Sequence, residues 1–204
     1  KKSLGQNFLK DPRIAAKTVE YAKISKDDVV IEVGPGHGIL TLALLETGAK
    51  VFAIEKDYEL GKKLEKIIRP RKSLTIVHQD ALFFDLSSFN MYKVVANLPF
   101  NVAAPLIRKF LEDKNQPELM VVMVQKEVAE KIVAPPGNSE RGILTLSVEF
   151  YAKAEIVIEV SKTNFQPQPK VDAAVIKIIP KPHLGGEGKS VKPELFFKIV
   201  KAGF

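Results

Sequence analysis

The sequence contains no cysteine, which excludes a disulfide framework, a thiol nucleophile and a metal site built from cysteine. Its three histidines, His37, His78 and His183, are too scattered for the spacing of a metal site. No apolar run reaches the roughly 18 residues that a membrane-spanning helix needs, and no signal-peptide pattern is present. We therefore expect a soluble, cytoplasmic protein without a metal or a membrane partner. Because no initiator methionine is present, we also expect a trimmed N-terminus.

Apolar residues and positive charge are both plentiful. Apolar residues make up 46% of the 204 residues, enough for one packed domain with a small appendage. The formal net charge is +7, and the excess lies at the two ends. Residues 1–26 hold seven Lys and Arg against two acids, and residues 181–204 hold five Lys against two Glu. A basic balance favours a polyanionic partner such as nucleic acid, although many basic surfaces are only solvated. No internal repeat is present, and a monomer is the default expectation.

The chain is organised around residues 29–38, VVIEVGPGHG, where an apolar run leads into three glycines on alternate positions. A short apolar run bounded by glycine is typical of a buried parallel strand. Glycines after such a strand let the backbone turn sharply and approach a ligand. The following residues, 39–45, are apolar enough for a helix packed on a sheet. Strand, glycine turn and helix together indicate a nucleotide-binding α/β domain.

The spacing of the glycines argues against a dinucleotide. The dinucleotide fingerprint is G-x-G-x-x-G, whereas Gly34, Gly36 and Gly38 bring the third glycine one residue early. Glu32, near the end of the strand, would repel a pyrophosphate but would suit a ligand that carries an ammonium group. The alternative interpretation is that these glycines only form a tight turn.

Acidic residues also stand at the ends of the next two predicted strands. Residues 50–55 predict a strand that ends in Glu55, about twenty residues after the first glycine, where an acid can accept hydrogen bonds from ribose hydroxyls. Residues 74–80 predict a strand that ends in Asp80, which could accept a hydrogen bond from an adenine amino group. The alternative for each acid is a surface carboxylate without a function.

The fourth predicted strand, residues 93–100, ends in the polar and aromatic sequence Asn97-Leu98-Pro99-Phe100. In an open α/β sheet the carboxyl ends of the strands face the ligand crevice. Asn97 supplies an acceptor oxygen and donor hydrogens, and Pro99 can aim the carbonyl of Leu98 outward. Phe100 offers a flat face to a base. The set suits the binding of an aromatic amine, whereas a plain turn into the next helix would explain only part of it.

The remaining patterns predict an α/β domain that ends in a hairpin. Helices are predicted after Asp11-Pro12 to residue 22 and over residues 57–69, 103–113, 125–133, 143–152 and from 194. Strands are predicted over residues 119–124, 155–160 and 172–179, the last two as an antiparallel hairpin at the sheet edge. Composition predicts loops over residues 134–142, 165–171 and 182–193.

Several of these motifs together resemble the ribosomal RNA adenine dimethyltransferases, which include the small-subunit enzymes of the KsgA type and the Erm resistance enzymes. The likeness covers nearly the whole chain and rests on LGQNFL (4–9), EVGPGHG (32–38), the acids Glu55 and Asp80, NLPF (97–100) and FQPQPKVD (165–172). It implies a Rossmann-like class I fold that binds S-adenosylmethionine (SAM), with a mostly parallel seven-stranded sheet and an antiparallel edge hairpin. The implied activity is N6-dimethylation of adenines in small-subunit ribosomal RNA, coupled to ribosome biogenesis.

The resemblance also implies roles for single residues. The expected cofactor contacts are Gln6, Asn7, Leu9, Glu32, Gly34, Gly36, Gly38, Glu55, Lys56, Asp80, Ala81 and Asn97. The expected catalytic residues are Asn97, Leu98, Pro99 and Phe100. Phe100 would stack on the target adenine, and Phe165 would close its other face. SAM is the expected cofactor, S-adenosylhomocysteine the product, and ribosomal RNA and the immature small ribosomal subunit are the expected partners.

Two features depart from the family pattern. Phe100 replaces the commoner Tyr, so a phenolic hydroxyl is not essential here, and the chain ends where a small helical domain would begin. We expect a SAM-binding domain over residues 1–180, then a linker and the start of a truncated helical C-terminal domain over residues 181–204.

The alternatives to this function are an Erm-type large-subunit methylase, a SAM-binding ribosome-assembly factor without catalysis, and an NAD-dependent oxidoreductase. Gly5, residues 125–131 and the sequence after Pro169 favour the small-subunit branch.

Overall fold

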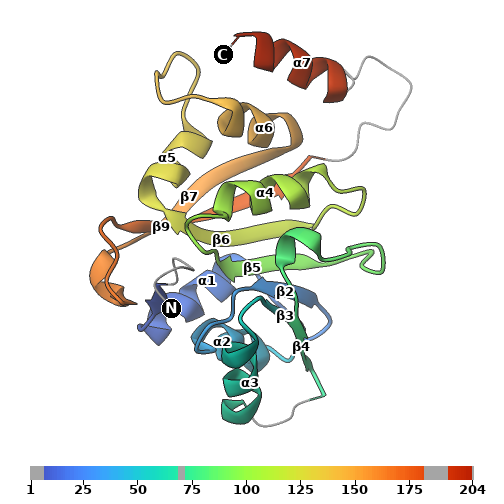
Figure 1. Cartoon of the computed structure of the whole chain (residues 1–204), viewed down its shortest axis with the longest axis vertical. Helices are drawn as coiled ribbons and strands as arrows, with labels where there is room; N and C mark the ends of the chain where they lie inside the picture. Colours follow the sequence, from blue (N-terminus) through green and yellow to red (C-terminus); the bar gives the residue numbers. More distant parts are fainter. Residues whose placement is uncertain (1–6, 69–71, 182–192, 204) are drawn as a thin grey trace.

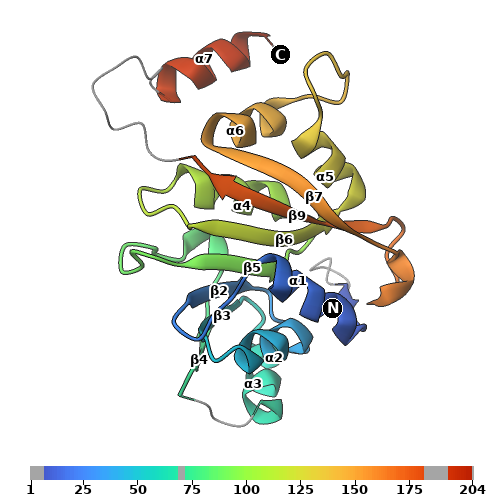
Figure 2. The same cartoon turned by 180° about the vertical axis from the view of Figure 1, so that it is seen from behind.

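The computed structural model describes residues 7–68, 72–181 and 193–203. A seven-stranded sheet runs through the molecule with helices on both of its faces (Figure 1, and from behind in Figure 2). Its strands, in spatial order, are β4 (Leu74–His78), β3 (Lys50–Glu55), β2 (Val29–Val33), β5 (Lys93–Asn97), β6 (Leu119–Gln125), β9 (Ala173–Pro180) and β7 (Ala152–Val160). Neighbouring strands from β4 to β6 pair in parallel, and β9 pairs antiparallel with both β6 and β7. The predicted seven-stranded sheet with an antiparallel edge hairpin is confirmed.

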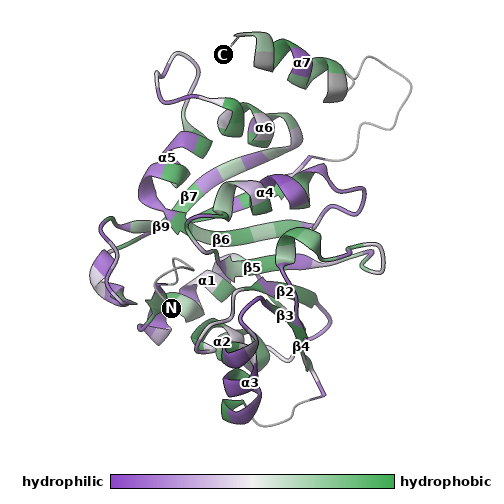
Figure 3. Cartoon of the chain, viewed as in Figure 1, coloured by the Kyte–Doolittle hydropathy of each residue, from purple (hydrophilic) through white to green (hydrophobic). Residues whose placement is uncertain are grey.

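Two layers of helices cover the sheet. The first layer consists of α1 (Pro12–Tyr21), α2 (Ile39–Glu46) and α3 (Tyr58–Ile67), and the second of α4 (Ala103–Glu112), α5 (Lys126–Val133) and α6 (Ile143–Tyr151). Strand β2 is apolar except for Glu32, and the packing of its two faces shows why. Val30 packs in the cluster of the first layer with Leu44, while its neighbour Ile31 packs in the cluster of the second layer with Leu106. A strand buried on both faces has no solvent-facing position, and Figure 3 shows the same hydrophobic character along β5 and β6.

The start of α1 lies where the sequence places it. The carboxylate of Asp11 accepts a hydrogen bond of 2.9 Å from the main-chain N–H of Arg13, and Pro12 occupies the first helical position. Because the first N–H groups of a helix lack partners within the helix, an aspartate cap satisfies one of them. The capped helix begins three residues after β1 (Phe8–Leu9) and so fixes where the N-terminal segment enters the fold.

The structure differs from the predicted elements in three places. Strand β4 ends two residues early at His78, because Asp80 accepts a hydrogen bond from the N–H of Leu82 and starts the short helix η2 (Ala81–Phe83). Strand β7 begins at Ala152, directly after α6. The segment predicted as a loop over residues 165–171 begins with a short strand, β8 (Phe165–Gln166), which pairs antiparallel with β1. The short helix η3 (Lys162–Asn164) precedes it.

The predicted linker over residues 182–193 lies almost wholly outside the described residues. Helix α7 (Pro193–Gly203) follows and packs on α6. The ring of Phe196 stacks on that of Phe150, with centroids 4.4 Å apart and planes 27° apart. In the part of the chain that the structure describes, no helix is long and apolar enough to cross a membrane.

Candidate active site

Two adjoining cavities open at the carboxyl ends of β2, β3, β4 and β5. The first lies between the loop after β2, the end of β5 and the segment of residues 7–9, which we call the N-terminal strap. The second lies between the ends of β3 and β4 and the start of α4. Gly34, Glu55 and Pro99 line both cavities and join them. The motifs at 32–38 and 97–100 and the acid Glu55, distant in sequence, therefore border one continuous space, as the sequence predicts.

The glycine loop comes close to the strap. Gly36 has a φ of +57°, which L side chains rarely adopt, and a Cβ built on it would lie 2.7 Å from Cδ1 of Phe8. The ring of Phe8 also lies against the imidazole of His37, with ring centroids 4.1 Å apart. Only a residue without a side chain allows this approach, so the glycine at position 36 sets the width of the first cavity.

Glu32 is a buried acid that forms no ion pair with any of the described residues. Its side chain lines the first cavity, the residue is 1% exposed, and its Oε2 has no hydrogen-bond partner among the described residues. Burial raises the pKa of Glu32 to about 8, and the nearby charge of Glu55 adds to the rise. The hydroxyl of Thr41 opposes the rise, although its geometry falls short of a hydrogen bond. An acid in this state would gain from a cationic partner in the cavity.

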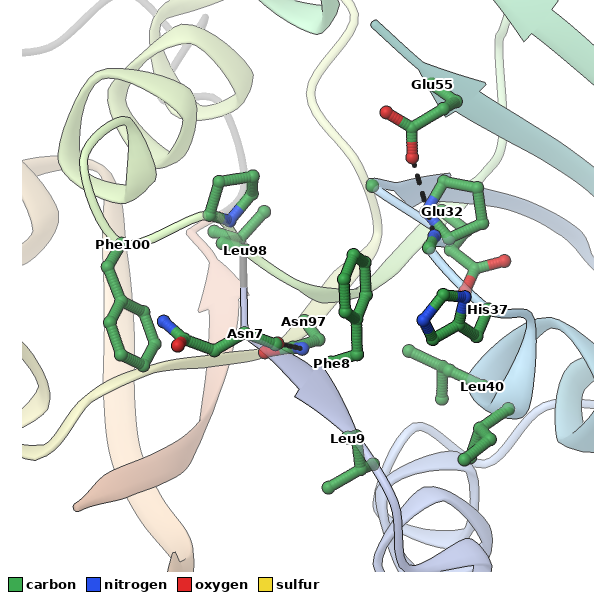
Figure 4. A pocket seen from close by; sticks show the side chains of 15 residues that line it. Asn7, Phe8, Leu9, Glu32, His37, Leu40, Glu55, Asn97, Leu98 and Phe100 are labelled. Atoms are coloured by element: carbon green, nitrogen blue, oxygen red, sulfur yellow. Dashed lines mark hydrogen bonds between the residues drawn. The ribbon is translucent and has the colours of Figure 1, made fainter. Parts of the chain in front are cut away.

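Glu55 ties the end of β3 to the glycine loop. Its Oε1 accepts a hydrogen bond of 2.9 Å from the N–H of Asp57, and its Oε2 accepts one of 3.4 Å from the N–H of Gly36 (Figure 4). Burial raises the pKa of Glu55, while these main-chain donors lower it. A carboxylate oxygen can accept more than one hydrogen bond, so both oxygens keep capacity for hydroxyl donors of a ligand.

Asp80 and Lys56 border the second cavity and pair with each other. The Nζ of Lys56 lies 2.8 Å from Oδ2 of Asp80, and Ala81 lies beside them. The hydrogen bond from Lys56 is the largest cause that lowers the pKa of Asp80, followed by the N–H of Leu82. Asp80 is therefore held as a carboxylate, which can only accept hydrogen bonds. Across the described ranges, no group of three or more acids and histidines is arranged to hold a metal ion.

The end of β5 presents an amide and a ring to the first cavity. The Nδ2 of Asn97 donates a hydrogen bond of 3.1 Å to the main-chain carbonyl of Asn7, while the buried Oδ1 of Asn97 has no partner within the described chain. Leu98 is held by its N–H, which donates to the carbonyl of Met123 at 3.0 Å, and its side chain is buried. Phe100 is half-buried, and Figure 4 shows its ring opposite the side chain of Asn7.

The structure does not support one expected residue and leaves another outside its description. Phe165 is 0% exposed and belongs to the same core cluster as Leu9. Its ring has no free face here, so the structure gives no support to base stacking by Phe165, which stays a prediction. Gln6 lies outside the described residues. The other expected residues line one or both cavities, except Gly38, which is buried and begins α2.

Sequence analysis also missed residues that line the cavities. Phe8, His37 and Leu40 border the first cavity, and Gln79, Asn101 and Val102 border the second. Phe8 stands inside the motif at residues 4–9, between two residues that were singled out. The signal in the sequence was a large aromatic residue within a short polar segment. Its contact with the glycine loop is visible only in the structure.

The comparisons with known proteins agree on one family. The sequence profile of the family described as ribosomal RNA adenine dimethylase matches residues 1–204. A protein of Clostridium botulinum named ribosomal RNA small subunit methyltransferase A is 41% identical over 208 residues, which cover 100% of this chain and 74% of that protein. The chain thus spans about three quarters of the length of that relative.

Solved structures show the same fold. The structure of a dimethyladenosine transferase from Plasmodium falciparum is similar with a TM-score of 0.78 and 34% identity, over 85% of this chain and 63% of that one. The structure of the 23S rRNA methyltransferase ErmE is similar with a TM-score of 0.79 and 28% identity, over 88% of this chain and 73% of that one. With its whole length matched by the family profile, the chain belongs to the ribosomal RNA adenine dimethylase family.

Proposed function

We propose that this protein uses SAM to transfer two methyl groups to N6 of adenines in small-subunit ribosomal RNA. One observation carries the proposal: Asn97 and Glu32 line the same cavity, and each has a buried oxygen, Oδ1 and Oε2, without a partner among the described residues. The first suits the amine of a target base, and the second suits the ammonium group of a methyl donor. Membership of the adenine dimethylase family is the independent support.

The residues around the two cavities fit SAM. Glu32 would hold the ammonium group of the methionine part, beside the glycine loop at residues 34–38. Glu55, where the two cavities join, would accept hydrogen bonds from the ribose hydroxyls, as the acid at the end of a second strand does in related folds. Asp80 and Ala81 would hold the adenine in the second cavity, with Lys56 keeping Asp80 ionised. Asn7 and Leu9 would cover the cofactor from the strap.

The target base would be held by the end of β5. An adenine within a helix cannot reach a buried site, so it must leave its stack, and Phe100 offers the exposed part of its ring for stacking. Such stacking contributes roughly 1–3 kcal/mol per base. The Oδ1 of Asn97 and the carbonyl of Leu98 would accept the two amine hydrogens. A nitrogen held this way becomes pyramidal, and its lone pair points away from the two acceptors.

Alignment and electrostatics then account for the catalysis. When bound, SAM supplies a methyl group on a positively charged sulfur. Asn97 and Leu98 direct the lone pair of the amine along one line and stabilise the positive charge that develops on nitrogen, without a strong base. A second transfer to the same nitrogen requires that one of the two acceptors tolerates a methyl group. The half-open side of the site at Phe100 leaves room for that change.

The comparisons favour the small-subunit branch over the Erm branch. Identity is 41% to a small-subunit methyltransferase and 28% to ErmE. We infer that the physiological substrate is the immature small subunit and that methylation is coupled to its assembly in the cytoplasm.

We also propose that residues 1–180 form the methyltransferase domain, because β9 ends at Pro180 and completes the sheet, and that residues 181–204 lead into a helical C-terminal part.

Methyl transfer to defined RNAs tests the proposal. The protein is incubated with SAM labelled in the methyl group and with immature small subunits, naked small-subunit RNA or large-subunit RNA, and the modified nucleoside is identified after digestion. We expect dimethyladenosine in small-subunit RNA. Label only in large-subunit RNA would assign the protein to the Erm branch. SAM binding without transfer to any RNA would favour an assembly factor, and stabilisation against heat by NAD instead of SAM would favour an oxidoreductase.

A further inference from the structure

The N-terminal strap is fixed against parts of the chain that are distant in sequence. Strand β1 pairs with β8, so that Phe8 lies opposite Gln166 and Leu9 opposite the fully buried Phe165. The N–H of Lys10 then donates a hydrogen bond of 2.8 Å to the carbonyl of Asn164. Main-chain contacts thus help to hold the strap at a defined position along the first cavity.

The end of the strap contacts the amide of Asn97. The Nδ2 of Asn97 donates to the carbonyl of Asn7 at 3.1 Å, as the dashed line in Figure 4 shows, and Oδ1 is left without a partner in the described chain. A primary amide can turn over by half a turn and exchange its donor and its acceptor. In the turned orientation Oδ1 would face the Asn7 carbonyl, and two acceptors would repel each other. The strap therefore favours the orientation in which Nδ2 faces the Asn7 carbonyl and Oδ1 stays without a partner among the described residues.

We infer that the main-chain carbonyl of Asn7 is a positioning group for methyl transfer, which orients the amide of Asn97 so that its oxygen, and not its nitrogen, faces the target amine. The inference rests on the proposed function, because it concerns the acceptor of the same reaction. The inference assigns a role to a main-chain atom. The position of this atom depends on the pairing of β1 with β8, which lies about 160 residues further along the chain. The orientation of the amide is thereby coupled to the segment between β7 and β9.

A pair of variants at Lys10 tests the inference away from both cavities. Lys10→Pro removes the N–H that holds the strap to Asn164, whereas Lys10→Ala keeps it, and both variants lose the same charge. We expect Lys10→Pro to slow single-turnover methyl transfer by about tenfold or more, because a small displacement of an aligned group is costly. Lys10→Ala should transfer at the wild-type rate. Transfer by both variants is measured at saturating SAM, so that a weaker contact between the strap and the cofactor does not contribute to the difference.

A spectroscopic readout separates orientation from general damage. The side-chain amide signal of Asn97 is assigned by NMR from its absence in Asn97→Ala. Its hydrogen-bonded proton should exchange slowly with water in the wild type and in Lys10→Ala, and rapidly in Lys10→Pro. A purely structural role would lower the melting temperature of Lys10→Pro and leave this amide protected. Equal rates and equal protection in the two variants would overturn the inference.

A change at a single atom provides the second test. Replacing Phe8 by its α-hydroxy analogue turns the carbonyl of Asn7 into an ester carbonyl, which is a weaker acceptor, removes the N–H of Phe8 and keeps every side chain. The same replacement at Leu9 weakens the carbonyl of Phe8 instead and serves as the control. We expect slower transfer only with the Phe8 ester, and equal effects of the two esters would contradict the role of Asn7. Absence of transfer by the wild type itself would refute the proposed function, whereas an active wild type with no effect of these changes would refute only the inference.

Discussion

At the scale of single residues, the buried acid Glu32 makes stability depend on pH. Its pKa is about 8 in the folded protein against an ordinary value of 4.5, so between these values the folded state binds a proton that the unfolded state has released. Stability is therefore lost as the pH rises through this window. Each pKa unit corresponds to about 1.4 kcal/mol, so the loss amounts to a few kcal/mol at most.

A Glu32→Gln variant should remove this dependence. We expect the free energy of unfolding of the variant, relative to the wild type, to improve as the pH is raised from about 5 to about 8, because glutamine does not ionise. Urea denaturation at both values measures the difference. The control for the loss of a carboxylate as such is Glu46→Gln at an exposed position. A constant difference for the Glu32 variant would show that Glu32 is ionised throughout.

Asn97 is the residue whose loss should affect chemistry more than binding. Asn97→Ala removes the acceptor Oδ1, and we expect methyl transfer to fall by about a hundredfold or more, as for other groups that act mainly in the transition state. The affinity for SAM should weaken much less, because Glu32 and Glu55 remain. Single-turnover rates and calorimetry measure the two effects separately. Equal losses of transfer and of affinity would remove Asn97 from the catalytic role.

At the scale of elements, the glycine loop lies so close to the strap that a side chain at position 36 would collide with Phe8. Gly36→Ala places a Cβ 2.7 Å from the ring of Phe8 at a positive φ, so either the loop or the ring of Phe8 must shift. The matched control is Gly137→Ala, which has a φ of +87° but nothing within 4 Å of its Cβ. Both variants carry backbone strain of roughly 1–2 kcal/mol.

Only the Gly36 variant should lose affinity for SAM. We expect similar decreases in melting temperature for Gly36→Ala and Gly137→Ala from the shared strain, and a further loss of SAM binding for Gly36→Ala alone. Thermal unfolding and calorimetry provide the two measurements. Unchanged SAM affinity in Gly36→Ala would mean that the first cavity does not hold the methionine end of the cofactor.

The longer helices and strands could be predicted from the sequence, whereas the shortest strands could not. Strand β3 has the predicted bounds. Its apolar run has the length of a strand, and the acid Glu55 marks where the run ends. The pairing of β1 with β8 was not predicted, since two-residue strands have no period and their partners lie far apart in the sequence. Because β8 could not be predicted, the burial of Phe165, which lies in this strand, could not be predicted either.

At the scale of the whole molecule, the order of strands explains why the site could be predicted. Parallel strands from β4 to β5 end at one edge, so an acid, a glycine loop and an amide that each follow a strand must come together there. Which atom of each residue is free could not be predicted. The unpartnered Oδ1 of Asn97 depends on the carbonyl of Asn7, and that contact forms only once the sheet has brought residues 7 and 97 together.

The net charge of +7 predicts how RNA binding responds to salt. Lysines and arginines that contact phosphates release counterions, so the logarithm of the binding constant should fall linearly with that of the salt concentration, by about 0.7–0.9 for each phosphate contacted. Fluorescence anisotropy with labelled small-subunit RNA between about 50 and 200 mM salt measures the slope. SAM affinity over the same range is the control and should change little, because Glu32 is shielded from the solvent. An RNA affinity independent of salt would mean that the basic residues are only solvated and that recognition depends on the base-binding site alone.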